Sequence, residues 1–274
     1  MVARGEDAAG MTINWFSPLP PAPSPLARLT QQLLPALAQR AKVVLWTAEK
    51  NWSSVLENFA EIQHYDPAVT AWAKINAAEV TIYHLANDAA EHAPIWAIAR
   101  AHPGIVVLHE ATLQPLLTSL LQREQIESAE YLRMVEFHHG EEGLAAVAAF
   151  LSGNCTLDRL GAAASMLGVA SENALGLVAT SRKMEAELTA ITSLPIAFLP
   201  SPATDPPASE IEQYVDALLQ LIRVTEKTRL EFAAHWLSSR VGQLLQPWYG
   251  ERNARLLLPN TTRALAELLG GEVR

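Results

Sequence analysis

The feature that most constrains this chain is an alternation between short apolar runs and longer segments of helical period. The short runs have strand length and are nearly continuous in Val, Ile and Leu, which is typical of strands buried on both faces. This alternation favours a parallel sheet covered by helices. The expected strands are Thr12–Phe16, Lys42–Thr47, Glu79–Leu85, Ile105–His109, Leu175–Thr180 and Pro195–Leu199.

Helical segments separate the expected strands. Ser24–Arg40 carries its leucines on one stripe, and Asp88 is placed to cap a helix over Ala89–Ala101. Ser181 is placed to cap Arg182–Thr189 in the same way. A helical insertion follows the fourth strand, with segments Leu113–Arg123, Gln125–Phe137 and Glu141–Leu151. The sequence therefore predicts an α/β fold, with a single doubly wound, mostly parallel, Rossmann-like sheet.

The composition changes after the last expected strand. Prolines at positions 200, 202, 206 and 207 indicate a stiff, extended linker. Helical segments follow at Ser209–Val224, Glu226–Leu245 and Glu251–Leu269. We expect a disordered lead over residues 1–10, with Met1 or Met11 as the start, and an α/β domain over 11–200. The expected organisation ends with a linker over 201–208 and a helical tail over 209–274 that packs back on the domain.

The composition also excludes several classes of protein. A net charge of −9 argues against a nucleic-acid partner, which would need a basic face. The single cysteine, Cys155, has no disulfide partner within the chain. The first ten residues lack the pattern of a signal peptide, and no run approaches the roughly 20 apolar residues of a membrane span. We therefore expect a cytoplasmic protein without a transmembrane segment.

Five short stretches carry a resemblance to a known family. They are Asn14–Ser24 with its proline-rich loop, Ile82–Asn87, His102–Glu110, Ala174–Ser181 and Leu194–Pro200. In this order and spacing they resemble the N-terminal, acceptor-side half of family 4 glycosyltransferases. These are retaining enzymes built from two facing Rossmann-like halves, the GT-B architecture. The resemblance covers Thr12 to Pro202.

The resemblance implies a second, sugar-nucleotide-binding half for which the chain has no room. Only 74 residues follow Pro200 (274 − 200), and one βαβ unit takes about 30 or more. The chain has no G-x-G-x-x-G and no P-loop. Ser24-Pro25 and Ala86 stand where the family leads us to expect glycines, and proline offers no N–H to a phosphate. We expect no donor site and no cofactor.

The resemblance also assigns candidate site residues at strand ends, where open parallel sheets bind ligands. His109 corresponds to the family histidine near the reacting sugar, which makes it the candidate catalytic residue. The candidate ligand-binding residues are Ser17, Ser24, Asn87 and Glu110. Packing, capping or turn roles are the alternative for these side chains.

A dense group of His and Glu between Glu136 and Glu142 raises the question of a metal site. Gly140 is expected to break the helix there, and the family reaction needs no metal held by the protein. We interpret the group as a solvated connection between helices and expect no metal.

Three functional hypotheses remain. The first is a non-catalytic glycosyltransferase-like subunit of a glycan-synthesis pathway, inactive alone. It would bind a glycan acceptor, a glycosyltransferase partner or a second copy through the face left by the missing half. The second is an active retaining transferase of the hexosyltransferase class, completed by a separate donor subunit or by dimerisation. The third is an unrelated doubly wound domain that binds a small molecule.

Overall fold

The computed structural model of the chain describes residues 10–225 and 227. The chain divides into two compact units, Met1–Ile222 and Arg223–Arg274, and the first contains the sheet. Apart from Gly10, the expected lead over 1–10 lies outside the described residues, as does the expected tail from residue 228 onward.

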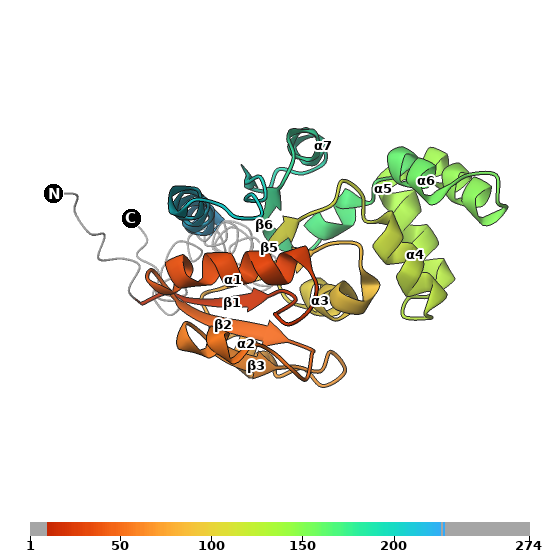
Figure 1. Cartoon of the computed structure of the whole chain (residues 1–274). Coiled ribbons are helices and arrows are strands. Elements are labelled where there is room, and N and C mark those ends of the chain that lie inside the picture. Colours follow the sequence, from red (N-terminus) through yellow and green to blue (C-terminus); the bar gives the residue numbers. More distant parts are fainter. Residues whose placement is uncertain (1–9, 226, 228–274) are drawn as a thin grey trace, which may run out of the picture. The chain divides into compact units, whose positions relative to one another are not determined.

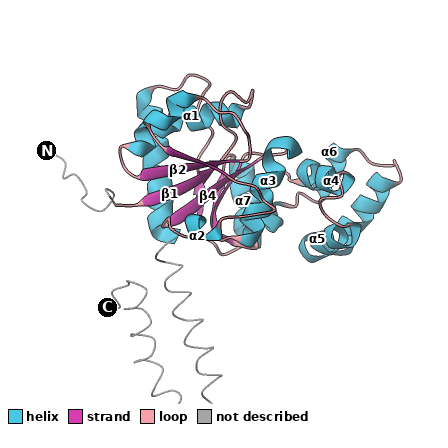
Figure 2. Ribbon diagram, turned by 90° about the horizontal axis from the view of Figure 1, so that it is seen from below, coloured by secondary structure: helices cyan, strands magenta, loops and turns pink. Residues whose placement is uncertain are grey.

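The first unit is built around one seven-stranded, all-parallel sheet (Figures 1 and 2). The strands are β1 (Thr12–Phe16), β2 (Lys42–Thr47), β3 (Glu61–His64), β4 (Val80–Leu85), β5 (Gly104–Leu108), β6 (Ala174–Ala179) and β7 (Ile196–Phe198). Their order in the sheet is β3-β2-β1-β4-β5-β6-β7. The chain winds outward from β1 to β3, returns to β4 beside β1, and winds outward in the other direction. The predicted doubly wound fold is confirmed.

Helices connect the strands on both faces. The α-helices are α1 (Pro25–Ala38), α2 (Trp72–Ile75), α3 (Ala89–Ala101), α4 (Gln114–Gln122), α5 (Ser128–Leu151), α6 (Leu157–Ala163) and α7 (Arg182–Ile191). The described residues also contain two 3₁₀ turns, η1 (Ser54–Asn58) and η2 (Leu167–Ser171), and a helix over residues 208–225. In both views α4, α5 and α6 gather to one side of the sheet (Figures 1 and 2).

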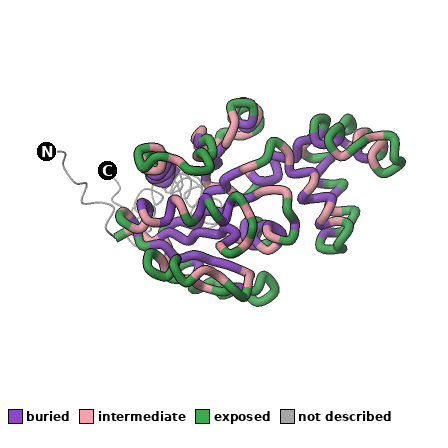
Figure 3. Tube along the Cα trace, viewed as in Figure 1, coloured by how far each residue is buried: buried purple, intermediate pink, exposed green. Residues whose placement is uncertain are grey.

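Each face of the sheet has its own apolar core, as the buried strands in Figure 3 indicate. Ile13 and Trp15 of β1 pack on the face covered by α1 and by helical residues 208–222, among them Val215 and Leu218. Phe16 packs on the opposite face, beneath α3, α4, α5, η2 and α7. Because successive strand residues point to opposite faces, β1 contributes to both cores.

Some elements of the structure match the sequence predictions, and one strand was not predicted. Strand Lys42–Thr47 and helix Ala89–Ala101 have the predicted bounds. The sequence analysis did not predict β3, a short edge strand whose only apolar residue is Ile62. The predicted break at Gly140 is confirmed as a kink inside α5, where this glycine has a φ of 59°.

One buried polar residue joins four elements at the centre of the sheet. Asn14, 1 % exposed, donates from Nδ2 to the carbonyl of Ile75 at 2.7 Å and to Thr81 Oγ1 at 3.2 Å. Its Oδ1 accepts from Trp46 Nε1 at 2.7 Å. A satisfied buried amide of this kind ties β1 to β2, β4 and α2.

We predict that Asn14→Ala lowers the free energy of unfolding by about 3 kcal/mol, because it leaves a buried indole N–H and a buried carbonyl without partners. Urea unfolding measures the loss. The control Asn154→Ala removes an exposed asparagine whose side chain donates only to Ser152. This control is expected to change stability by less than about 0.5 kcal/mol, and equal losses in both variants would contradict the assignment.

Candidate functional site

The carboxyl ends of β1, β4 and β5 lie side by side where the winding of the sheet reverses. Open parallel sheets bind ligands at this position, because the connections on its two sides leave in opposite directions. Ser17 follows β1, Asn87 follows β4 by two residues, and His109 follows β5. The fold therefore brings three of the predicted site residues to neighbouring strand ends.

His109 is half-buried and pairs with a second histidine that the sequence analysis did not single out. Its Nε2 lies 2.9 Å from Nδ1 of His84, the last residue but one of β4. The two rings stack with centroids 5.2 Å apart and planes inclined by 21°. His84 is 1 % exposed, and the indole of Trp15 lies on it at 4.4 Å.

A third histidine, His92, lies in the first turns of α3 and is also 1 % exposed. Its Nδ1 is 3.0 Å from the backbone carbonyl of His84. The Nε2 atoms of His84 and His92 are both buried and have no hydrogen-bond partner among the described residues. The nearest carboxylate oxygen to His92 Nε2, Oε2 of Glu91, is 3.8 Å away.

Burial keeps all three imidazoles neutral at neutral pH. It lowers the pKa of His109 to about 3, with a further contribution from His92. Burial lowers the pKa of His92 to about 4. The pKa of His84 falls well below 6.5, through burial first and then through His109 and His92. Neutral imidazoles each offer one donor and one acceptor nitrogen, so this group forms hydrogen bonds rather than ion pairs.

Ser17 belongs to a buried hydrogen-bond chain beside the histidines. Trp15 Nε1 donates to Thr30 Oγ1 at 3.1 Å, and Thr30 Oγ1 donates to Ser17 Oγ at 2.9 Å. Ser17 is 2 % exposed. These hydrogen bonds fix the indole against which His84 packs. In this conformation Ser17 therefore stabilises the site from within the core and is not exposed to a ligand.

The other predicted residues take different places. Asn87 Nδ2 donates to the carbonyl of Thr112 at 3.0 Å, while its Oδ1 is buried without a partner among the described residues. Ser24 caps α1, because its Oγ accepts from Leu26 N at 3.4 Å. Glu110 is exposed. The structure therefore places Asn87 near the loop after β5, Ser24 at a helix end and Glu110 in solvent.

Two carboxylates add negative charge to this edge. Glu49 follows β2 by two residues, and Glu91 lies in the first turn of α3. Burial and then the charge of Glu91 raise the pKa of Glu49. Carboxylates in such positions accept hydrogen bonds from hydroxyl groups and disfavour anionic ligands.

The loop after β1 offers few backbone donors. Residues 17–25 include five prolines, and the N–H of Ala22 already donates to the carbonyl of Leu19 at 3.0 Å. Pro25 is the first residue of α1, and the N–H of Leu26 is taken by Ser24. Phosphate sites at helix N-termini need several N–H groups aimed at the ligand, which this loop lacks.

The dense histidine and glutamate group on α5 makes contacts with other parts of the chain. His138 Nε2 lies 2.8 Å from Glu172 Oε1, and His139 Nε2 accepts from Met166 N at 3.2 Å. Within residues 10–225 and 227, no group of three or more His, Cys, Asp or Glu side chains is arranged to hold a metal ion.

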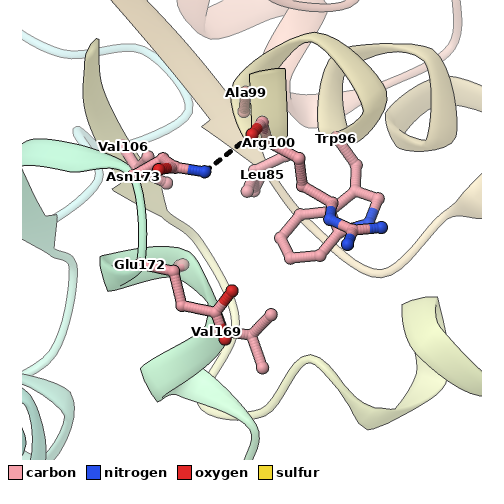
Figure 4. Close-up of a pocket in the computed structure, with 9 residues that line it drawn as sticks. Leu85, Trp96, Ala99, Arg100, Val106, Val169, Glu172 and Asn173 are labelled. Carbon is pink, nitrogen blue, oxygen red and sulfur yellow. Dashed lines mark hydrogen bonds between the residues drawn. The ribbon is translucent and has the colours of Figure 1, made fainter. Parts of the chain in front are cut away.

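Two hollows lie among residues other than those of the candidate site. Figure 4 shows the smaller one, where Asn173 donates to the carbonyl of Arg100 at 2.7 Å and Glu172 faces the indole of Trp96. Its volume is about 10 Å³, room for about one water molecule. The larger hollow, about 440 Å³, lies outside α3 near the start of α5, with Trp96 and Arg100 in its wall. None of the candidate site residues lines either hollow.

Comparisons with protein-family models, with curated proteins and with solved structures give no significant match to this chain. Among the described helices, none has the length and apolar character needed to cross a membrane.

The buried histidines predict a stability that falls in acid. Above pH 6.5, the ordinary pKa, His92 is neutral both folded and unfolded; below it the unfolded chain binds a proton that the folded chain, with its pKa of about 4, refuses. Between pH 6.5 and pH 4, His92 alone therefore lowers the free energy of unfolding by about 1.4 kcal/mol for each pH unit of acidification. His84 and His109 act in the same direction.

Urea unfolding at pH 7, 6 and 5 measures this dependence. We expect His92→Gln to make the pH dependence shallower by about 1.4 kcal/mol per pH unit, because the amide keeps a donor for the carbonyl of His84 without titrating. His84 and His109 maintain the rest of the slope. The matched control His64→Gln replaces an exposed histidine of β3 and should leave the slope unchanged. A wild-type stability that is flat from pH 7 to pH 5 would show that these imidazoles are not buried as described.

Proposed function

We propose that this chain is a family 4 glycosyltransferase-like acceptor-side module whose described residues hold no sugar-nucleotide site of their own. It is a non-catalytic subunit of cytoplasmic glycan synthesis, and it binds a glycan acceptor or a protein partner of the same pathway. The observation that supports this proposal is the meeting of Ser17, Asn87 and His109 at three neighbouring strand ends. Those residues belong to three of the stretches that carry the family resemblance.

The chemistry of this edge suits a neutral, hydroxyl-rich ligand better than a nucleotide sugar. This edge supplies hydrogen-bonding groups without positive charge: neutral His109, the carboxylates of Glu49 and Glu91, and Oδ1 of Asn87, which has no partner among the described residues. A diphosphate needs cations or clustered N–H groups, and the proline-rich loop supplies neither. Glycan hydroxyls, in contrast, both donate to carboxylates and accept from imidazole.

A second candidate is an active retaining transferase completed by a separate donor subunit or by dimerisation. The position of His109 favours it, because this imidazole stands at the ligand edge of the sheet. In that case the isolated chain would bind acceptor, and transfer would begin only when the donor subunit is added.

Calorimetry of the purified chain tests the proposal. The ligands are neutral oligosaccharides of glucose, mannose, galactose and N-acetylglucosamine, and a matched panel of UDP- and GDP-sugars. We expect binding of an oligosaccharide, weakened about tenfold or more by His109→Ala through the loss of a buried hydrogen bond. The control His138→Gln alters a histidine that pairs with Glu172 and is expected to leave the affinity unchanged.

Two outcomes would contradict this proposal. One is micromolar binding of a nucleotide sugar by the lone chain, and the other is sugar transfer from such a donor without a second protein. No binding of any oligosaccharide would instead favour a protein partner or an unrelated small molecule as the ligand.

A further inference from the structure

We propose that His84 is a positioning residue that fixes His109 as a hydrogen-bond donor. His84 donates from Nδ1 to His109 Nε2, so His109 keeps its own proton on Nδ1 and offers it to an oxygen atom at the carboxyl edge. The identity of that oxygen as part of a glycan rests on the proposed function. The proton arrangement itself rests only on the contacts of the three histidines.

The contacts of His92 determine which of its two ring nitrogens carries the proton. Its Nδ1 lies 3.0 Å from the backbone carbonyl of His84, and a carbonyl can only accept. His92 therefore carries its proton on Nδ1 and leaves Nε2 bare. This bond also fixes the end of β4, because it ties the backbone of His84 to the first turns of α3.

His84 then has two options in its 2.9 Å contact with His109. If His109 donated, the proton of neutral His84 would lie on Nε2, a buried atom without a partner among the described residues. If His84 donates, the same atom carries only a lone pair. Buried N–H groups without acceptors are rarer in folded proteins than under-used acceptors, so the second arrangement is preferred.

This arrangement of protons determines what Nδ1 of His109 can bind. With Nε2 occupied by His84, Nδ1 is the nitrogen left for a ligand, and it makes no hydrogen bond with the described residues. A protonated Nδ1 has no lone pair. It therefore binds an acceptor oxygen and is unable to remove a proton from a ligand. His109 is in this way a binding group rather than a general base.

Long-range ¹H–¹⁵N spectra of the ¹⁵N-histidine-labelled chain at pH 7.5, without ligand, test the inference. The signals of His109 are identified by their loss in His109→Asn. In the wild type we expect His109 and His84 each to show a protonated Nδ1 and a bare Nε2. In His84→Leu, which cannot donate, we expect a smaller share of His109 to be protonated on Nδ1, because nothing then holds its Nε2 as an acceptor. In His84→Gln, whose amide can donate, Nδ1 should stay protonated.

The matched control His138→Gln lies outside the cluster and should leave the His109 signals in place. A wild-type His109 protonated on Nε2 overturns the inference, and so does a wild-type His84 protonated on Nε2. Where His84→Leu fails to fold, the wild-type spectrum and His84→Gln still decide. Because no sugar enters the experiment, a chain that binds no oligosaccharide but shows this tautomer would refute only the glycan-binding form of the proposed function.

Discussion

An all-parallel sheet has to be covered on both faces, because its strands are joined only by crossovers that pass over those faces. In this chain the requirement is clearest at β1, the first described strand, which lies between β2 and β4 in the interior of the sheet. Ile13 and Trp15 anchor one core, Phe16 anchors the other, and the amide of Asn14 ties three strands and α2 together. The winding of the sheet also reverses beside β1, so the strand that anchors both cores ends at the candidate site.

The histidines at this place show how burial decides chemistry. An imidazole in water would be partly charged near neutral pH, whereas the pKa values of these three are lowered by the apolar shell around them. Trp15 contributes to this shell directly, since its ring lies on His84. The indole is held in turn by Thr30 and Ser17, so a residue predicted as a ligand contact acts in this structure through the core.

Much of the fold could be predicted from the sequence, because apolar runs such as Val43 to Trp46 leave little choice about burial. The strand β3 could not, since an edge strand buries little and Glu61–His64 carries no apolar pattern. His109 was found through its strand end, while His84 and His92 were not. Histidines inside apolar segments are ordinarily packed core residues, and their pairing depends on the neighbouring strand. The signal that was available is an imidazole at the last position but one of an otherwise buried strand.

The helix over residues 208–222 gives the fold an unusual dependence on the order of synthesis. Its apolar side shares one core with Ile13 and α1, and Arg40 forms ion pairs with Glu212 and Asp216, which lie more than 170 positions later in the chain. A nascent chain that ends in the proline-rich stretch has all seven described strands, but it leaves the part of this face beside α1 uncovered. Completion of the native core therefore waits until this helix has left the ribosome, and a shorter recombinant form cut at the prolines would expose that face to aggregation.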